Sequence, residues 1–175
     1  MRPLLTTLIC LLLAAPLAAQ KQKREPLTEE QQDQIAETGI NPVARVDLYV
    51  KFLNERSATI KGLVPRAKSS ARLRRISDEL QDFAALMDEL SDNLDLYSER
   101  KADIRKSLKG LNESIASWQL VLRNMPNEPG FELSLKEAIA SANDLADQAK
   151  QLTADQEAYF KAHPEQKNQD RYEPQ

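Results

Sequence analysis

A heptad stripe of apolar residues runs from Leu73 to Met125 without an intervening proline. The stripe advances in alternating steps of three and four residues, and only Lys101 interrupts the apolar series. A period of 3.5 residues keeps one seam of a helix facing a partner helix. The chain is therefore predicted to be all-α, either an antiparallel helical bundle or a set of elongated, coiled-coil-like helical hairpins. The predicted helix seam consists of Leu73, Ile76, Leu80, Phe83, Met87, Leu90, Leu94, Tyr97, Ile104, Leu108, Leu111, Ile115, Trp118, Leu122 and Met125.

The length of the helix that carries this stripe is open to two interpretations. The heptad phase continues unchanged and residues 66–109 contain no glycine or proline, which favours one rod over about residues 69–124. Such a rod would be about 80 Å long, because an α-helix rises about 1.5 Å per residue. A break near residues 98–103 would instead let four helices close into a compact bundle. The continuous rod is the favoured prediction, and the broken helix is the alternative.

Three further helices are predicted around this segment, over residues 28–38, 42–64 and 132–162, with the clearest turn of the chain at residues 126–130. Residues 27–162 thus form a single helical domain, followed by a frayed polar tail. The helix over residues 42–64 has a stripe of its own, and the last helix has a face of small residues that would let two helices approach closely. The stripe is Val43, Val46, Val50, Leu53, Ser57, Ile60 and Val64, and the small face is Leu135, Ile139, Ala142, Ala146 and Ala149, with Leu145 and Leu152 beside it.

The first 19 residues have the pattern of a signal peptide. A charged start is followed by a short apolar run and by small residues that suit cleavage after Ala19. Residues 20–26 would then be a flexible leader, and residues 163–175 the tail. The mature protein is expected to be exported, to the periplasm or the extracellular space, without stable insertion in a membrane afterwards.

Composition restricts the chemistry that such a protein could perform. Cys10 is the only cysteine and lies in the apolar run, so the mature chain would have no disulfide, thiolate metal site or cysteine nucleophile. The formal net charge of −3 does not favour binding to nucleic acid, which draws on strong positive potential. His163, the only histidine, precedes a proline in a polar stretch, where a solvated surface position is expected.

Acidic and basic clusters have a structural and a functional interpretation. The acidic run falls off the heptad seam, so it is predicted to be a solvated face rather than a metal site. The basic clusters are expected to pair with acids across helices, with contact to anionic lipid or polymer as the alternative. No catalytic, metal-binding or cofactor-binding residue is predicted, and no enzyme activity is expected. The acidic run is Asp88, Glu89, Asp92, Asp95 and Glu99, and the basic clusters are Arg66, Lys68, Arg72, Arg74 and Arg75, then Arg100, Lys101, Arg105, Lys106 and Lys109.

Three apolar residues of the helix over residues 42–64 lie off its stripe. Leu48, Tyr49 and Phe52 make the apolar face of that helix wide. A wide face indicates either two neighbouring helices in a bundle or a surface for a partner protein. These residues are therefore the candidate partner surface.

A short motif occurs twice in the chain. Residues 27–31 (Leu-Thr-Glu-Glu-Gln) and 152–156 (Leu-Thr-Ala-Asp-Gln) both fit the pattern L-T-x-x-Q. Two copies in a small exported helical protein resemble the Spy/CpxP family of periplasmic chaperone-like proteins. The resemblance implies a curved helical homodimer that cradles unfolded clients and needs no cofactor. The first copy also fits a stapled capping box at a helix start.

The sequence therefore predicts a protein that acts by helix–helix contact. The leading expectation is an exported interaction or structural protein that binds a protein partner or self-associates through the heptad seam. A periplasmic holdase-type chaperone is the alternative. A cofactor-binding helical bundle is a remote further alternative.

Overall fold

The computed structural model describes residues 25–167. The predicted signal peptide, most of the predicted leader and the tail beyond residue 167 lie outside the described residues. Within residues 25–167 the chain is helical and contains no strand, so the all-α prediction is confirmed. The elements are α1 (Glu29–Glu37), α2 (Pro42–Leu63), α3 (Ser70–Glu99), α4 (Arg105–Arg123), α5 (Glu132–Ala162) and the 3₁₀ helix η1 (Pro164–Gln166).

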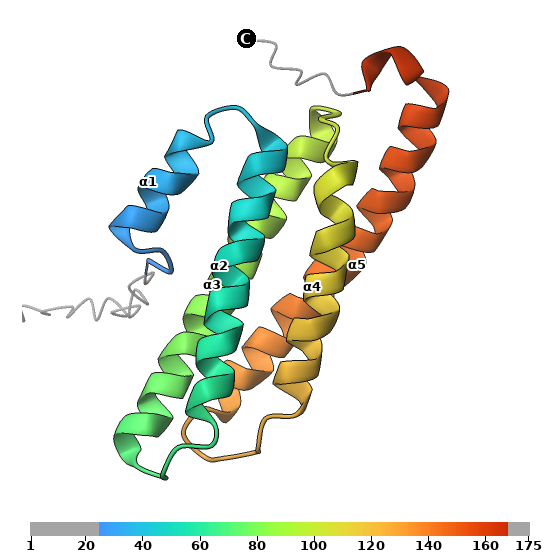
Figure 1. The fold of residues 1–175 in the computed structure, drawn as a ribbon. Helices are drawn as coiled ribbons and strands as arrows, with labels where there is room; N and C mark the ends of the chain where they lie inside the picture. The colour runs from blue at the N-terminus through green and yellow to red at the C-terminus, as the bar shows by residue number, and fades with distance from the viewer. Residues whose placement is uncertain (1–24, 168–175) are drawn as a thin grey trace, which may run out of the picture.

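Helices α2 to α5 pack as a four-helix bundle, with α2–α3 and α4–α5 as antiparallel hairpins, and α1 lies outside it beside α2 (Figure 1). Helices α3 and α4 each contact both α2 and α5, so the order around the bundle is α2, α3, α5, α4. The chain therefore crosses the diagonal of the bundle between α3 and α4. Helices α2 and α4 run in the same direction and finish at what we call the lower end, as drawn in Figure 1. The α3–α4 turn and the end of α5 form the upper end.

The favoured prediction of one continuous rod over residues 69–124 is wrong, because α3 ends at Glu99 and α4 begins at Arg105. Lys101 takes the left-handed conformation, with φ 55°. The Ala102 N–H donates to the Tyr97 carbonyl at 3.0 Å, which is the hydrogen bond of a helix C-terminal cap. The break thus falls at residues 100–104, around the one polar residue in the apolar series.

The heptad phase is the same before and after this turn, because α3 and α4 both direct their seam residues into one core. Phe83 of α3 and Trp118 of α4 meet edge to face across the core, with ring centroids 5.8 Å apart. The Trp118 indole N–H also donates to Asn54 of α2 at 2.8 Å. Every predicted seam residue from Ile76 to Met125 is buried, and only Leu73 is half-buried. The seam is therefore closed within one chain, and this burial outweighs the local preference for an unbroken helix.

A buried glutamine of α5 fastens the α3–α4 turn. Gln156 is 5% exposed, and its Nε2 donates to the Ala102 carbonyl at 2.7 Å. Its Oε1 accepts from the Ile104 N–H at 3.1 Å. Ile104 is the N-cap residue of α4 and has no side-chain cap of its own. One amide group therefore satisfies two backbone groups that the broken helix would otherwise bury without partners.

A buried arginine ties the lower end together. Arg72 of α3 donates to the carbonyls of Leu63 and Val64, at 3.1 and 2.6 Å, where α2 ends. Its two terminal nitrogens also meet the Glu128 carboxylate in the α4–α5 loop, at 3.0 and 3.3 Å. The guanidinium holds the pKa of Glu128 below its usual range through this hydrogen bonding. A positive charge in the first turn of α3 is unfavourable for that helix. Arg72 offsets this cost because its guanidinium donates hydrogen bonds to the free carbonyls at the C-terminus of α2.

A second arginine holds the segment before α1. Arg56 of α2 donates to Glu79 at 3.1 Å and to Asp82 at 3.2 Å, both on α3, and to the carbonyl of Pro26. Leu27 is buried beside it, at 7% exposure. The end of the predicted flexible leader is therefore packed against the bundle.

The buried face of α5 differs by one position from the predicted line. Ile139 and Ala146, expected at its centre, are only half-buried, as is Leu135. The expected polar tail also begins later, because η1 forms directly after α5. Small residues still occupy the buried face, as predicted, and let α5 approach both α3 and α4. The buried residues are Ser134, Ala138, Ala142, Leu145, Ala149, Leu152, Gln156 and Phe160.

The closed seam predicts a large effect of a charge in the core. Leu90 is fully buried, so Leu90→Asp should lower the free energy of unfolding by at least about 3 kcal/mol, measured by urea unfolding followed by circular dichroism. Leu133→Asp, at a leucine that is 69% exposed, is the matched control and should stay within about 0.5 kcal/mol of wild type. Equal midpoints for the two variants would contradict burial of the seam.

The glutamine at the α3–α4 turn generates a second prediction. Gln156→Leu leaves the Ala102 carbonyl and the Ile104 N–H buried without partners, at a cost of about 1–3 kcal/mol for each group. The variant should therefore unfold at lower urea concentration, and the Ile104 amide should exchange its hydrogen faster in native-state hydrogen exchange. Gln151→Leu is the control, because Gln151 is exposed and bonds only to Asp155 on the same helix. Unchanged Ile104 protection would rule out the fastening role.

Candidate interaction surface

The residues predicted as a partner surface lie largely inside the protein. Tyr49 is 4% and Phe52 is 1% exposed, and Leu48 is half-buried against the core. Helix α2 contacts α1, α3 and α4, so its apolar face has to be wider than one heptad seam. These three residues therefore serve packing, and the prediction that they form a partner surface is wrong.

Tyr49 belongs to a buried polar cluster between α2 and α3. Burial raises the pKa of Tyr49 to about 12, and the negative charge of Glu89 adds to the rise. Burial also raises the pKa of Tyr97, whose hydroxyl donates to Asn93 at 3.4 Å. A phenol with a pKa this high keeps its proton at neutral pH. The Tyr49 phenol therefore serves packing in its protonated form.

His163 is held at the end of α5 by its neighbours. Its ring stacks on Tyr159, with centroids 4.4 Å apart, and its Nδ1 lies 3.0 Å from the Tyr159 carbonyl. Within residues 25–167 no three His, Cys, Asp or Glu side chains lie close enough together to hold a metal ion. In the acidic run, Glu89 is half-buried and the other four residues are exposed, with Asp95 accepting from Gln148 at 2.6 Å.

The two L-T-x-x-Q motifs perform different tasks. In the first, Thr28 and Gln31 form the capping box predicted for the start of α1, through bonds of 3.1 and 3.2 Å. In the second, inside α5, Thr153 accepts from Asn112 of α4 at 3.1 Å, and Gln156 fastens the α3–α4 turn. The likeness of the two motifs therefore does not reflect a shared local structure.

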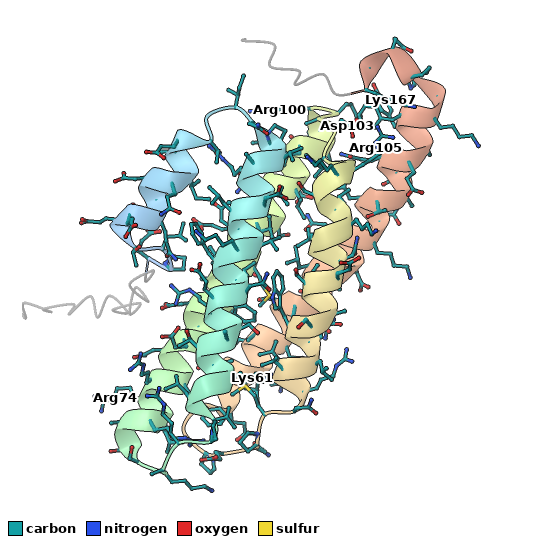
Figure 2. All side chains as sticks on the ribbon, in the orientation of Figure 1. Lys61, Arg74, Arg100, Asp103, Arg105 and Lys167 are labelled. Carbon is teal, nitrogen blue, oxygen red and sulfur yellow. The ribbon has the colours of Figure 1, made fainter. Side chains whose placement is uncertain are left out.

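The surface is hollowed at the lower end, between the last turns of α2 and α4. This α2–α4 hollow has a volume of about 200 Å³. Leu120, on its wall, is 61% exposed, and Lys61 is the only charged residue among those that line it. Figure 2 shows Lys61 at this end of the bundle. The lining residues are Lys61, Val64, Pro65, Leu120, Val121, Asn124 and Met125.

One basic residue lines the α2–α4 hollow, and two more lie next to its lining residues in the sequence. Lys61 lines it, Arg66 directly follows Pro65, and Arg123 lies one helical turn after Leu120. All three basic residues are exposed. None of them forms an ion pair with another residue in the described part of the chain. The hollow therefore combines an apolar floor with uncompensated positive charge.

The hollow could not be predicted from the sequence because two helices and a loop bring its lining together. Val64 and Met125 end their stripes, and in sequence they look like ordinary seam residues. The signal that was present is Leu120, a leucine outside the heptad seam on a helix with an otherwise polar outer face.

Comparison with known proteins does not assign the chain. No family model, no curated protein and no solved structure matches it. None of the helices within residues 25–167 combines the length and the apolar character required to cross a membrane.

The high pKa of Tyr49 predicts alkaline destabilisation. Below pH 10 the phenol is protonated in both the folded and the unfolded state, and its contribution to stability is complete. Between pH 10 and about pH 12 the unfolded chain loses the proton more readily, so the free energy of unfolding should fall as pH rises. Tyr49→Phe should show a shallower fall over this range in urea titrations at stepped pH. Identical slopes would show that Tyr49 ionises normally in the folded protein.

Proposed function

We propose that this protein is an exported interaction protein that binds a partner protein at the α2–α4 hollow. One observation carries the proposal: an apolar hollow with an exposed leucine lies on the surface of a bundle whose own seam is already buried. Apolar surface rimmed by polar residues is typical of interaction sites. The hollow is thus the place where contact with a partner would bury further apolar area.

The other polar clusters of the structure support a role by contact. Arg72 and Glu128 join the loops of the lower end, Gln156 fastens the turn of the upper end, and the Tyr49 cluster fills space between α2 and α3. Each of these groups has a structural partner and a structural task. The hollow is the feature that such packing does not explain.

A holdase-type chaperone is the second candidate function. Exposed Leu120 beside the hollow favours it, because unfolded clients are bound through apolar contacts. The two candidates differ in selectivity. A hollow of fixed shape should select one partner or a few, whereas a holdase should bind many unrelated clients.

Site-specific photo-crosslinking in the native host tests the proposal. A photoreactive phenylalanine analogue at position 120 should give a discrete adduct with one partner, because this side chain projects from the wall of the hollow. The same analogue at Ile40, which is 66% exposed in the loop between α1 and α2, is the matched control and should give no such adduct. Adducts are separated by mass and identified by peptide sequencing.

Competition with unlabelled protein tests whether the crosslink forms at the hollow. Added wild-type protein should suppress the adduct, and added Leu120→Asp protein should not. Equal adducts from positions 120 and 40, or equal competition by the wild-type and Leu120→Asp proteins, would contradict the proposed docking function. A broad ladder of unrelated adducts from position 120 would favour the holdase instead.

A further inference from the structure

The two segments that form the α2–α4 hollow are free of acidic residues. Residues 57–77, which include the end of α2 and the start of α3, contain no Asp or Glu, and neither do residues 114–127 of α4 and its loop. This is unusual in a chain that has 27 acidic and 24 basic residues. The segregation places positive charge at the hollow although the whole chain is acidic.

Few of these positive charges are neutralised by neighbouring acids. Arg72 pairs with Glu128, and Lys68 reaches the same carboxylate at 4.0 Å. The remaining basic residues of the two segments are exposed and make no ion pair within residues 25–167. Figure 2 shows one of them, Arg74, at the same end as Lys61. The exposed, unpaired residues are Lys61, Arg66, Arg74, Arg75 and Arg123.

The size of the hollow limits what it can hold. A cavity of about 150 Å³ accepts a benzene ring, so a hollow of about 200 Å³ has room for one aromatic or leucine side chain. It lies between the last turns of two neighbouring helices that run in the same direction. A groove between helices is the site at which an amphipathic helix inserts apolar anchors.

The shape of the site distinguishes a helix from a lipid surface. A bilayer surface is flat on this scale, and proteins bind it with apolar side chains that project outward. At the lower end Val64, Val121 and Met125, which are half-buried or buried, line a recess, and Leu120 and Pro65 are the exposed apolar residues of its lining. A recess matches a projecting side chain of a partner better than it matches a bilayer.

We propose that the α2–α4 hollow binds an acidic amphipathic helix of a partner protein. One large apolar side chain of that helix enters the hollow, and the Asp or Glu residues beside it face Lys61, Arg66 and Arg123. This inference rests on the proposed docking function and names the chemistry of its partner.

Designed peptides test the charge requirement. The probes are three fluorescein-labelled amphipathic helices of about five turns that share one stripe of leucine and phenylalanine and carry Glu, Gln or Lys at the flanking positions. Binding to the protein is measured by fluorescence anisotropy. The Glu peptide should bind about tenfold more tightly than the Gln peptide, and the Lys peptide more weakly still. Affinity for the Glu peptide should fall as salt rises, because exposed charges are screened.

Charge reversal on the protein supplies the matched controls. Lys61→Glu/Arg123→Glu should weaken binding of the Glu peptide by at least about tenfold and improve binding of the Lys peptide. Arg100→Glu/Lys161→Glu changes net charge equally, also at the ends of helices, but at the upper end, and should leave binding unchanged. Thermal unfolding of both double variants shows whether they remain folded. Leu120→Asp should reduce binding of all the peptides.

The outcomes separate this inference from the docking function. Equal binding of the Glu and Gln peptides, lost in Leu120→Asp, would overturn the charge requirement and leave docking intact. No binding of any peptide, together with a specific crosslink from position 120, would overturn the acidic helix as partner. No binding and no crosslink would overturn both. Cosedimentation with phosphatidylglycerol vesicles that requires Lys61 and Arg123, without peptide binding, would replace the helix with an anionic membrane.

Discussion

Burial of one heptad seam on itself is the constraint from which the rest of this structure follows. The stripe from Leu73 to Met125 is too apolar to face water, and it is long enough to fold back across a core. Folding back requires a turn near its middle, and the turn at residues 100–104 breaks the backbone hydrogen-bond ladder there. The positive φ of Lys101 and the amide of Gln156 make that break tolerable. The break is confined to one turn, whereas folding back buries apolar surface along the whole length of α3 and α4.

Buried polar groups determine which ends of the helices meet. The core is lined by aliphatic side chains, which pack with little directional preference. Gln156 forms hydrogen bonds with the backbone of the α3–α4 turn. Arg72 forms them with the end of α2 and with the α4–α5 loop, and Trp118 donates one to Asn54 on α2. Apart from the bonds of Arg72 to the end of the preceding helix, these bonds join residues that are 52 to 64 positions apart in the sequence. They favour this helix order because each would lose its partner in another order.

The sequence predicted the parts of the fold that depend on local pattern and could not predict those that depend on tertiary contacts. The capping residues Thr28 and Asn41 predicted two helix starts. The heptad period of the apolar residues predicted the buried seam. The choice between a rod and a bundle depended on burial of the seam across the core and on a contact from Gln156, which lies 52 residues from Ile104 in the chain. Tyr49 and Phe52 could have served packing or a partner until their neighbours were placed. The α2–α4 hollow could not be predicted for the same reason, because its walls come from helices that are separate in the sequence.

The unbroken heptad register across residues 100–104 has a topological consequence. A straight helix through these residues would keep both halves of the seam in phase, so the α4–α5 hairpin of one copy could complete the α2–α3 hairpin of another. The core contacts of such an exchanged dimer would be those of the monomer. Two features favour the self-contained chain over such a dimer: the high effective concentration of its own hairpin, and the two hydrogen bonds that Gln156 makes to the bent backbone.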